Sequence, residues 1–210
     1  MRVIGIVGRM AAGKSTVARR FAELGAVVLD ADAVAHEVLD EPEALAAIAA
    51  RFGAGVLAAD GRASRPALAR RVFGPDAEHA AALAELEAIV HPRVRARLDA
   101  LLADLRAAEA ADGRPRVAVL DVPLLVQAGW AEACDLVVVV ECPDDVRRAR
   151  LEARGMGSAE RLAREAAWSR GWNPDTLPPG KTAAVDAAGN PAYTRLQVDR
   201  IWERIRDERR

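Results

Sequence analysis

The sequence contains few aromatic residues, cysteines, histidines and lysines. Of its 210 residues, 4% are aromatic, two are cysteine, three are histidine and two are lysine. With so few aromatic side chains, the core has to be built mainly from Ala, Leu and Val. Cys134 and Cys142 form no C-x-x-C pair, so a structural zinc site is not expected. We interpret both cysteines as small buried side chains in a reducing compartment.

Long apolar runs and a strong charge of either sign are also missing. No stretch approaches the roughly 20 apolar residues that a transmembrane helix needs, and no signal peptide precedes the first apolar segment. The formal net charge is −1, with acidic and basic residues interspersed. We therefore expect a cytosolic protein with a small-molecule substrate and no nucleic-acid or membrane partner. We also expect a monomer or weak homo-oligomer, although no sequence feature specifies the oligomeric state.

The first 16 residues carry the most specific motif. An apolar run that includes Val3–Val7 leads into Gly8-x-x-x-x-Gly13-Lys14-Ser15, and a helix-compatible run from Thr16 to Leu24 follows. In such a loop, backbone N–H groups converge on phosphate oxygens, Lys14 supplies a positive charge and Ser15 can ligate Mg²⁺. The alternative is a glycine-bearing turn with a surface lysine. The flanking strand and helix patterns favour a nucleoside triphosphate site.

Strand-like runs alternate with helical patterns along the rest of the chain, which predicts an α/β fold with a parallel sheet between layers of helices. The predicted strands are Val3–Val7, Ala26–Leu29, Val117–Leu120 and Leu136–Val140, with a weaker candidate at Thr182–Val185. A C-terminal helix is expected from Pro191 to Arg209.

A long helical segment separates the second and third strands. Leu83, Leu86, Val90 and further apolar residues up to Leu105 recur at helical spacing. Since Pro92 interrupts this stripe, we expect one helix to end near His91 and another to begin around Pro92. The predicted organisation is one domain over 1–210, with a core at 1–39 and 116–210, a helical substrate-binding insertion at 40–115 and a lid at about 143–181.

Three carboxylates follow predicted strands. Asp30 and Asp32 follow the second strand, and Asp121 ends the third. The carboxyl ends of parallel strands face the ligand, so Asp32 is a candidate general base and Asp121 a candidate Mg²⁺ ligand. The alternatives are that Asp32 begins the next helix as a cap, and that Asp121 only terminates its strand.

Basic residues occur at two further places. His91-Pro92 lies within the helical insertion, and a lone histidine is usually structural. Arg147, Arg150 and Arg154 share helical spacing after the fourth strand, with Arg161 and Arg164 beyond. Surface arginines are mostly solvated, but these are placed to close over a triphosphate.

Taken together, the motifs resemble the dephospho-CoA kinase family over about the first 165 residues. The resemblance rests on the phosphate loop, Asp30-Ala-Asp32, Phe52-Gly53, Ala59-Asp60-Gly61, Leu68-x-x-Arg71-Val72-Phe73, His91-Pro92-x-x-Arg95, Asp121-Val-Pro-Leu-Leu125 and the arginine-bearing helix. It implies a phosphate-loop kinase fold and transfer of the γ-phosphoryl group of ATP to the ribose 3′-hydroxyl of dephospho-CoA.

The resemblance also implies roles for individual residues. Asp32 and Lys14 would be catalytic, and Ser15 with Asp121 would hold Mg²⁺. The acceptor would be bound by Asp32, Arg71, His91, Arg95, Pro123 and Leu124. The nucleotide would be bound by Gly8, Ala11, Ala12, Gly13, Lys14, Ser15, Thr16, Arg150 and Arg154.

The chain departs from the usual family pattern in several places. Arg9, Ala11 and Ala12 stand where the loop usually has Gly, Gly and Ser. Val126-Gln127, Trp168 and the segment around Ala187 also differ, and the last two bear on adenine contacts. Two alternatives therefore stay open: another small-metabolite or nucleoside kinase of this fold, or a nucleotide-binding regulatory module with impaired catalysis.

Overall fold

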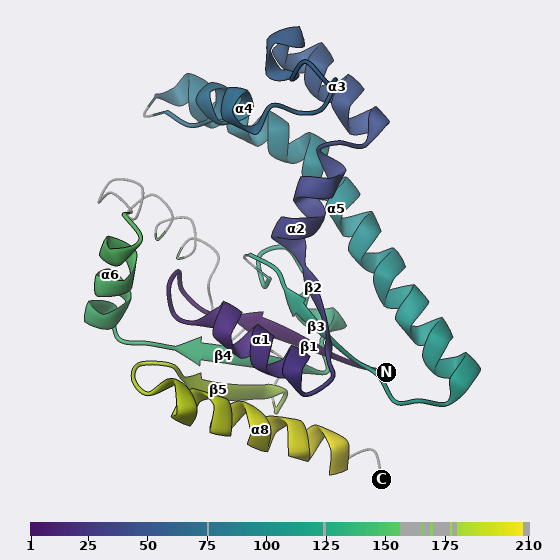
Figure 1. The fold of residues 1–210 in the computed structure, drawn as a ribbon, viewed down its shortest axis with the longest axis vertical. Coiled ribbons are helices and arrows are strands. Elements are labelled where there is room, and N and C mark those ends of the chain that lie inside the picture. The colour runs from purple at the N-terminus through teal and green to yellow at the C-terminus, as the bar shows by residue number, and fades with distance from the viewer. Residues whose placement is uncertain are drawn as a thin grey trace. The chain divides into compact units, whose positions relative to one another are not determined.

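The computed structural model describes residues 1–74, 76–123, 125–155, 165, 169, 177 and 180–207 (Figure 1). Its strands are β1 (Arg2–Val7), β2 (Val27–Asp30), β3 (Val117–Asp121), β4 (Leu136–Glu141) and β5 (Thr182–Asp186). Its α-helices are α1 (Lys14–Glu23), α2 (Ala31–Val38), α3 (Pro42–Phe52), α4 (Arg65–Val72), α5 (Ala77–Asp112), α6 (Asp144–Ala153) and α8 (Pro191–Asp207). Short 3₁₀ turns cover Ala54–Val56 and Ala131–Ala133.

The strands form one sheet in the order β2-β3-β1-β4-β5, and every neighbouring pair is parallel. All five strand predictions are confirmed, with ends that differ by one residue. Parallel strands need crossover connections: α1 connects β1 to β2, and α2 to α5 connect β2 to β3. The predicted α/β class, with a parallel sheet and flanking helices, is therefore confirmed.

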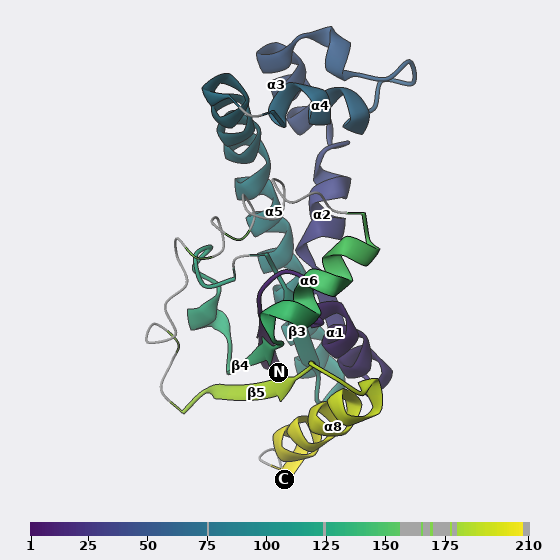
Figure 2. The same cartoon turned by 90° about the vertical axis from the view of Figure 1, so that its left-hand side faces the viewer.

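One face of the sheet packs against α1 and α8 (Figures 1 and 2). Alternate strand residues such as Ile4, Ile6 and Val138 point to this face and are fully buried. Phe21 of α1 and Val198 of α8 complete the cluster from the helices. This packing fixes the start of α1 over the carboxyl end of β1, which is where the phosphate-loop motif lies.

The prediction that the long helical segment breaks at Pro92 is wrong. Helix α5 is continuous over 36 residues, with Pro92 inside it. Proline in a helix removes a backbone hydrogen bond and costs about 3 kcal/mol. The burial of Val90, Leu98 and Leu102 on both sides of the proline offsets this cost, and Arg93 Nη1 donates to the Ile89 carbonyl at 2.6 Å in the same turn.

The described chain divides into two compact units, Met1–Asp30 with Asp104–Arg210, and Ala31–Ala103. The first contains the sheet and the second contains α2, α3, α4 and most of α5. The second unit has its own apolar cluster around Ile48, Val56 and Leu68. The limits expected for the core, insertion and lid stay predictions, and residues 156–164, 166–168, 170–176 and 178–179 of the lid lie outside the described residues.

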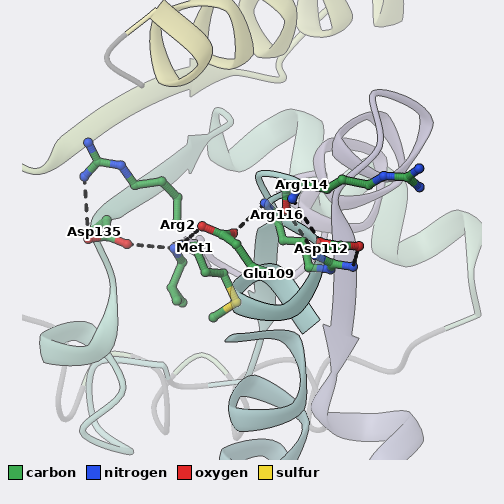
Figure 3. A network of polar contacts seen from close by, with 8 residues as sticks. Met1, Arg2, Glu109, Asp112, Arg114, Arg116 and Asp135 are labelled. Atoms are coloured by element: carbon green, nitrogen blue, oxygen red, sulfur yellow. Dashed lines mark hydrogen bonds and ion pairs between the residues drawn. The ribbon is translucent and has the colours of Figure 1, made fainter. Parts of the chain in front are cut away.

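The amino ends of the strands are held by a network of polar contacts (Figure 3). The amino group of Met1 lies 2.6 Å from Glu109 Oε1, and Glu109 Oε2 accepts the backbone N–H of Arg116 at 2.7 Å. Arg116 donates both Nη groups to the two carboxylate oxygens of Asp112, at 2.7 and 2.8 Å. Asp135 accepts the N–H of Val3 at 2.8 Å. These contacts connect the end of α5 to the starts of β1 and β3.

Candidate active site

Residues 8–13 form a loop between β1 and α1, as the motif predicts. Gly13 is the N-cap of α1 with φ 114°, a conformation that favours glycine, and no side chain caps the helix. No acidic residue lies in the first turn, which contains Lys14, Ser15 and Thr16. The backbone N–H groups at this helix end and the positive end of its dipole therefore suit an anion.

Glycine is also required at the start of the loop. A Cβ at Gly8 would lie 2.7 Å from the Val140 carbonyl oxygen of β4, closer than real Cβ atoms come. The same glycine accepts a hydrogen bond on its carbonyl from Lys14 Nζ, at 2.9 Å. The lysine side chain therefore folds back along the loop, and its charge lies beside the loop backbone.

The middle of the loop contains the one described non-glycine residue with positive φ. Ala11 has φ 60°, which costs an L-residue about 1 kcal/mol. Arginines of α6 bind the carbonyls around it. Arg150 Nη1 donates to Ala11 and Ala12 at 3.2 and 3.3 Å, and its Nη2 donates to the Ala187 carbonyl at 2.7 Å. Arg150, predicted to contact the nucleotide, thus lies against the phosphate loop itself.

Two acidic residues lie at the carboxyl edge of the sheet beside the loop. Asp30 and Asp121 are register partners on β2 and β3. Val119 lies two residues before Asp121 and packs in the cluster beneath α1, so strand alternation puts Asp121 on the α1 face. Helix α1, with Ser15 in its first turn, lies on this face.

Asp32 lies in the first turn of α2 and is exposed. The strand ends at Asp30, so Asp32 belongs to the helix and not to a continued strand. The other predicted acceptor residues of the second unit are exposed too. His91 and Arg95 are four residues apart on α5, and such a pair shares one helix face. Arg95 Nε lies 3.4 Å from Asp99 Oδ2.

Arg71 lies in α4 and lines a pocket of about 230 Å³ within the second unit. Arg51, Phe52, Arg70, Glu78 and His79 line the same pocket. Its lining therefore holds three guanidinium groups and one carboxylate, an excess of positive charge that suits an anionic ligand.

Three further residues were predicted to bind the acceptor or the nucleotide: Pro123, Leu124 and Arg154. Pro123 is exposed just after β3, and Arg154 is exposed at the C-cap of α6. Leu124 lies outside the described residues, as does Trp168.

Sequence reasoning missed the contacts of Arg9 and Arg147. Arg9 was noted only as a departure from the usual loop pattern, and Arg147 only as one of several helical arginines. Arg147 is 2% exposed and donates to the Met10 carbonyl at 3.0 Å. The sequence gives no sign of this contact, because Met10 and Arg147 are 137 residues apart in the chain.

The parallel sheet, the loop after its first strand and the uncapped α1 terminus together define a phosphate-loop protein of the α/β kinase class. Comparison with known proteins specifies the family. The family model described as dephospho-CoA kinase matches residues 2–168. The chain therefore belongs to the dephospho-CoA kinase family.

Individual relatives agree with this assignment. A dephospho-CoA kinase of Anaeromyxobacter dehalogenans is 42% identical over 217 aligned positions, covering 100% of this chain and 94% of that protein. One of Symbiobacterium thermophilum is 40% identical, covering 96% of this chain and 80% of that protein. The crystal structure of TT1252 from Thermus thermophilus superposes with a TM-score of 0.71 at 30% identity, covering 99% of this chain and 97% of that one.

Proposed function

We propose that this protein transfers the γ-phosphoryl group of ATP to the ribose 3′-hydroxyl of dephospho-CoA, the last step of coenzyme A biosynthesis. The observation that carries the proposal is a phosphate loop with its lysine, built between β1 and α1 in a chain of the dephospho-CoA kinase family. Phosphoryl transfer needs little covalent chemistry from the protein. Positioning and charge neutralisation therefore supply most of the catalysis.

The loop residues would bind the triphosphate. Backbone N–H groups from Gly13, Lys14 and Ser15 lie at the α1 terminus, where partial positive charge accumulates. Lys14 would turn from the Gly8 carbonyl to the transferring phosphoryl group and stabilise the charge that develops there.

Ser15 and Asp121 fit a magnesium ion bound together with the nucleotide. Both supply oxygen donors, which Mg²⁺ prefers, and both lie by the α1 face of the sheet edge. Among the described residues no group of three or more His, Cys, Asp or Glu side chains could hold a metal ion. A Mg²⁺ ion held by Ser15 and Asp121 would take its other ligands from phosphate and water, and it would neutralise phosphate charge.

Asp32 would orient the acceptor hydroxyl and accept its proton. The carboxylate is exposed in the first turn of α2, so a substrate hydroxyl has access to it. His91, Arg95 and Arg71 would hold the remainder of the acceptor, whose phosphate groups suit bidentate arginine contacts.

In the part of the chain that the structure describes, no helix is long and apolar enough to cross a membrane.

The decisive experiment measures ADP release from ATP with dephospho-CoA, against adenosine and gluconate as other hydroxyl acceptors. Dephospho-CoA should be preferred by orders of magnitude, and phosphorus NMR of the product should place the new phosphate on the ribose 3′ oxygen. Preferred turnover of adenosine or gluconate would establish a different kinase. Nucleotide binding without any acceptor-dependent ADP release would identify a regulatory module.

Arg95→Lys tests the acceptor role of the second unit. The ion pair of Arg95 with Asp99 is exposed and therefore weak, so a ligand can displace it. Lysine cannot reproduce a bidentate contact, and we expect the KM for dephospho-CoA to rise about ten-fold with little change for ATP.

Arg97→Lys, at an exposed position on the same helix, is the matched control and should leave both constants unchanged. An equal rise in the two KM values for Arg95→Lys would contradict an acceptor contact.

A further inference from the structure

Arg147 of α6 is a charged side chain inside the protein. It is 2% exposed, and a guanidinium in such a place needs hydrogen-bond and charge partners. Its Nη2 group donates to Asp144 Oδ1 at 2.8 Å and to Glu165 Oε1 at 3.0 Å. Its Nη1 group donates to the Met10 carbonyl of the phosphate loop at 3.0 Å. One of its donors is therefore used on the loop backbone.

Arg9, within the loop, binds the same two carboxylates. Its Nη1 donates to Asp144 Oδ1 at 2.7 Å, and its Nη2 lies 3.6 Å from Glu165 Oε2. Two arginines and two carboxylates thus form a balanced cluster, which we call the loop clamp (Arg9, Asp144, Arg147 and Glu165). Burial alone would lower the pKa of Arg147, but its hydrogen bonds to Asp144 and Glu165 raise it above the usual value, so the guanidinium stays charged.

The clamp acts on the peptide that precedes the strained residue of the loop. In a trans peptide the C=O and the following N–H point in opposite directions. When Arg147 holds the Met10 carbonyl toward α6, the N–H of Ala11 is turned away from α6. Ala11 itself has φ 60°, where glycine would need no external support.

We propose that Arg147 is a positioning residue of the phosphate loop, and that the loop clamp keeps the Met10–Ala11 peptide in its phosphate-binding orientation, next to an alanine in a left-handed conformation. The proposal rests on the proposed function, in which this loop binds ATP. Arg147 acts through the Met10 carbonyl and not by touching the substrate. The arginine supplies, from a neighbouring helix, the conformational restraint that a loop with a left-handed alanine requires.

The test compares Arg147→Gln with Arg148→Gln, the same substitution at the next residue of α6, which is exposed. ATP binding is measured by calorimetry without acceptor, followed by steady-state kinetics with both substrates. Loss of a charged hydrogen bond predicts that Arg147→Gln weakens ATP binding about ten-fold or more. The KM for dephospho-CoA should change less than about two-fold, and Arg148→Gln should behave like the wild type.

A second substitution separates positioning from general stability. Ala11→Gly lowers the conformational cost of the loop, so in the Arg147→Gln background it should restore ATP affinity about five-fold. If Arg147→Gln does not fold, Arg147→Lys takes its place: lysine keeps the charge for Asp144 and Glu165, but its single Nζ cannot replace both Nη groups, so the same weakening of ATP binding is expected. Unchanged ATP affinity, an equal rise of both KM values, or no rescue by Ala11→Gly would overturn the proposal. Failure of wild-type ATP binding would instead overturn the proposed function.

Discussion

The two ends of the sheet each carry a cluster of arginines and carboxylates, and the clusters differ in what the arginines bind. At the amino ends, Arg116 is 24% exposed and gives a forked pair of hydrogen bonds to Asp112 (Figure 3). At the carboxyl ends, Arg147 is 2% exposed and Arg150 is half-buried, and both donate to carbonyls of the phosphate loop. The first cluster joins chain segments to one another, and the second sets the conformation of a loop.

This difference follows from the geometry of a parallel sheet. All carboxyl ends lie at one edge, where loops converge and a ligand can be bound, while the amino ends collect only connections. Ion pairs at the amino edge can therefore affect folding stability alone. At the carboxyl edge, ion pairs and hydrogen bonds also affect ligand binding. Substitutions at the carboxyl edge should therefore change enzyme kinetics, and substitutions at the amino edge should change only unfolding.

The largest expected effect is that of Lys14→Ala at the carboxyl edge. Phosphoryl transfer should be lost to the detection limit, because the ammonium group stabilises charge in the transition state. The fold should remain, since the lysine is half-buried at the edge of the loop and its removal leaves no core cavity. Coupled ADP release and thermal unfolding measure the two properties.

Lys181→Ala is the matched control at the amino edge. Lys181 is the other lysine of the chain, exposed just before β5, and its backbone carbonyl accepts the N–H of Val137. Its side chain should contribute nothing to turnover. Similar losses of activity in the two variants would contradict the separation of the edges.

Asp32→Asn should have the next largest effect. The amide keeps the size of the side chain but cannot take up a proton, so kcat should fall by roughly 10²–10⁴ while ATP binding is retained. Asp30→Asn, at the end of β2, is the comparison variant. A severe loss in Asp30→Asn with a mild one in Asp32→Asn would show that the roles of the two carboxylates were exchanged.

The local sequence pattern was sufficient to predict the sheet and the phosphate loop. Runs such as Val117–Leu120 are apolar throughout because parallel strands are buried on both faces, and this signal does not depend on the rest of the chain. The glycines of the loop could be predicted in the same way. A Cβ at Gly8 would be too close to the backbone of β4, and Gly13 has a positive φ that favours glycine.

Features that depend on tertiary contacts were not predictable. Helix α5 continues through Pro92 because residues on both sides of the proline are buried, and a local rule on proline takes no account of burial. The clamp around Arg147 joins residues far apart in the chain, and its arginine looks like its exposed neighbour Arg148 in sequence. Burial, which separates the two, is a property of the fold.

The smallest expected effect, and the one that tests the amino edge, is that of Asp112→Asn. Hydrogen bonds from Arg116 and from the N–H of Arg114 lower the pKa of Asp112 from 3.8 to about 2. A carboxyl group with a lowered native pKa contributes stability above its unfolded pKa and loses that contribution as the pH falls through the native one. The variant should therefore unfold at a slightly lower temperature than the wild type at about pH 7, and the difference should shrink between about pH 4 and about pH 2.

Asp104→Asn, at an exposed position on the same helix, is the control and should show no such dependence on pH. Turnover and both KM values should stay at the wild-type level in each variant, because Asp112 lies at the amino edge, away from the phosphate loop. A kinetic change in Asp112→Asn without a change in unfolding would show that the amino edge communicates with the phosphate loop through the strands.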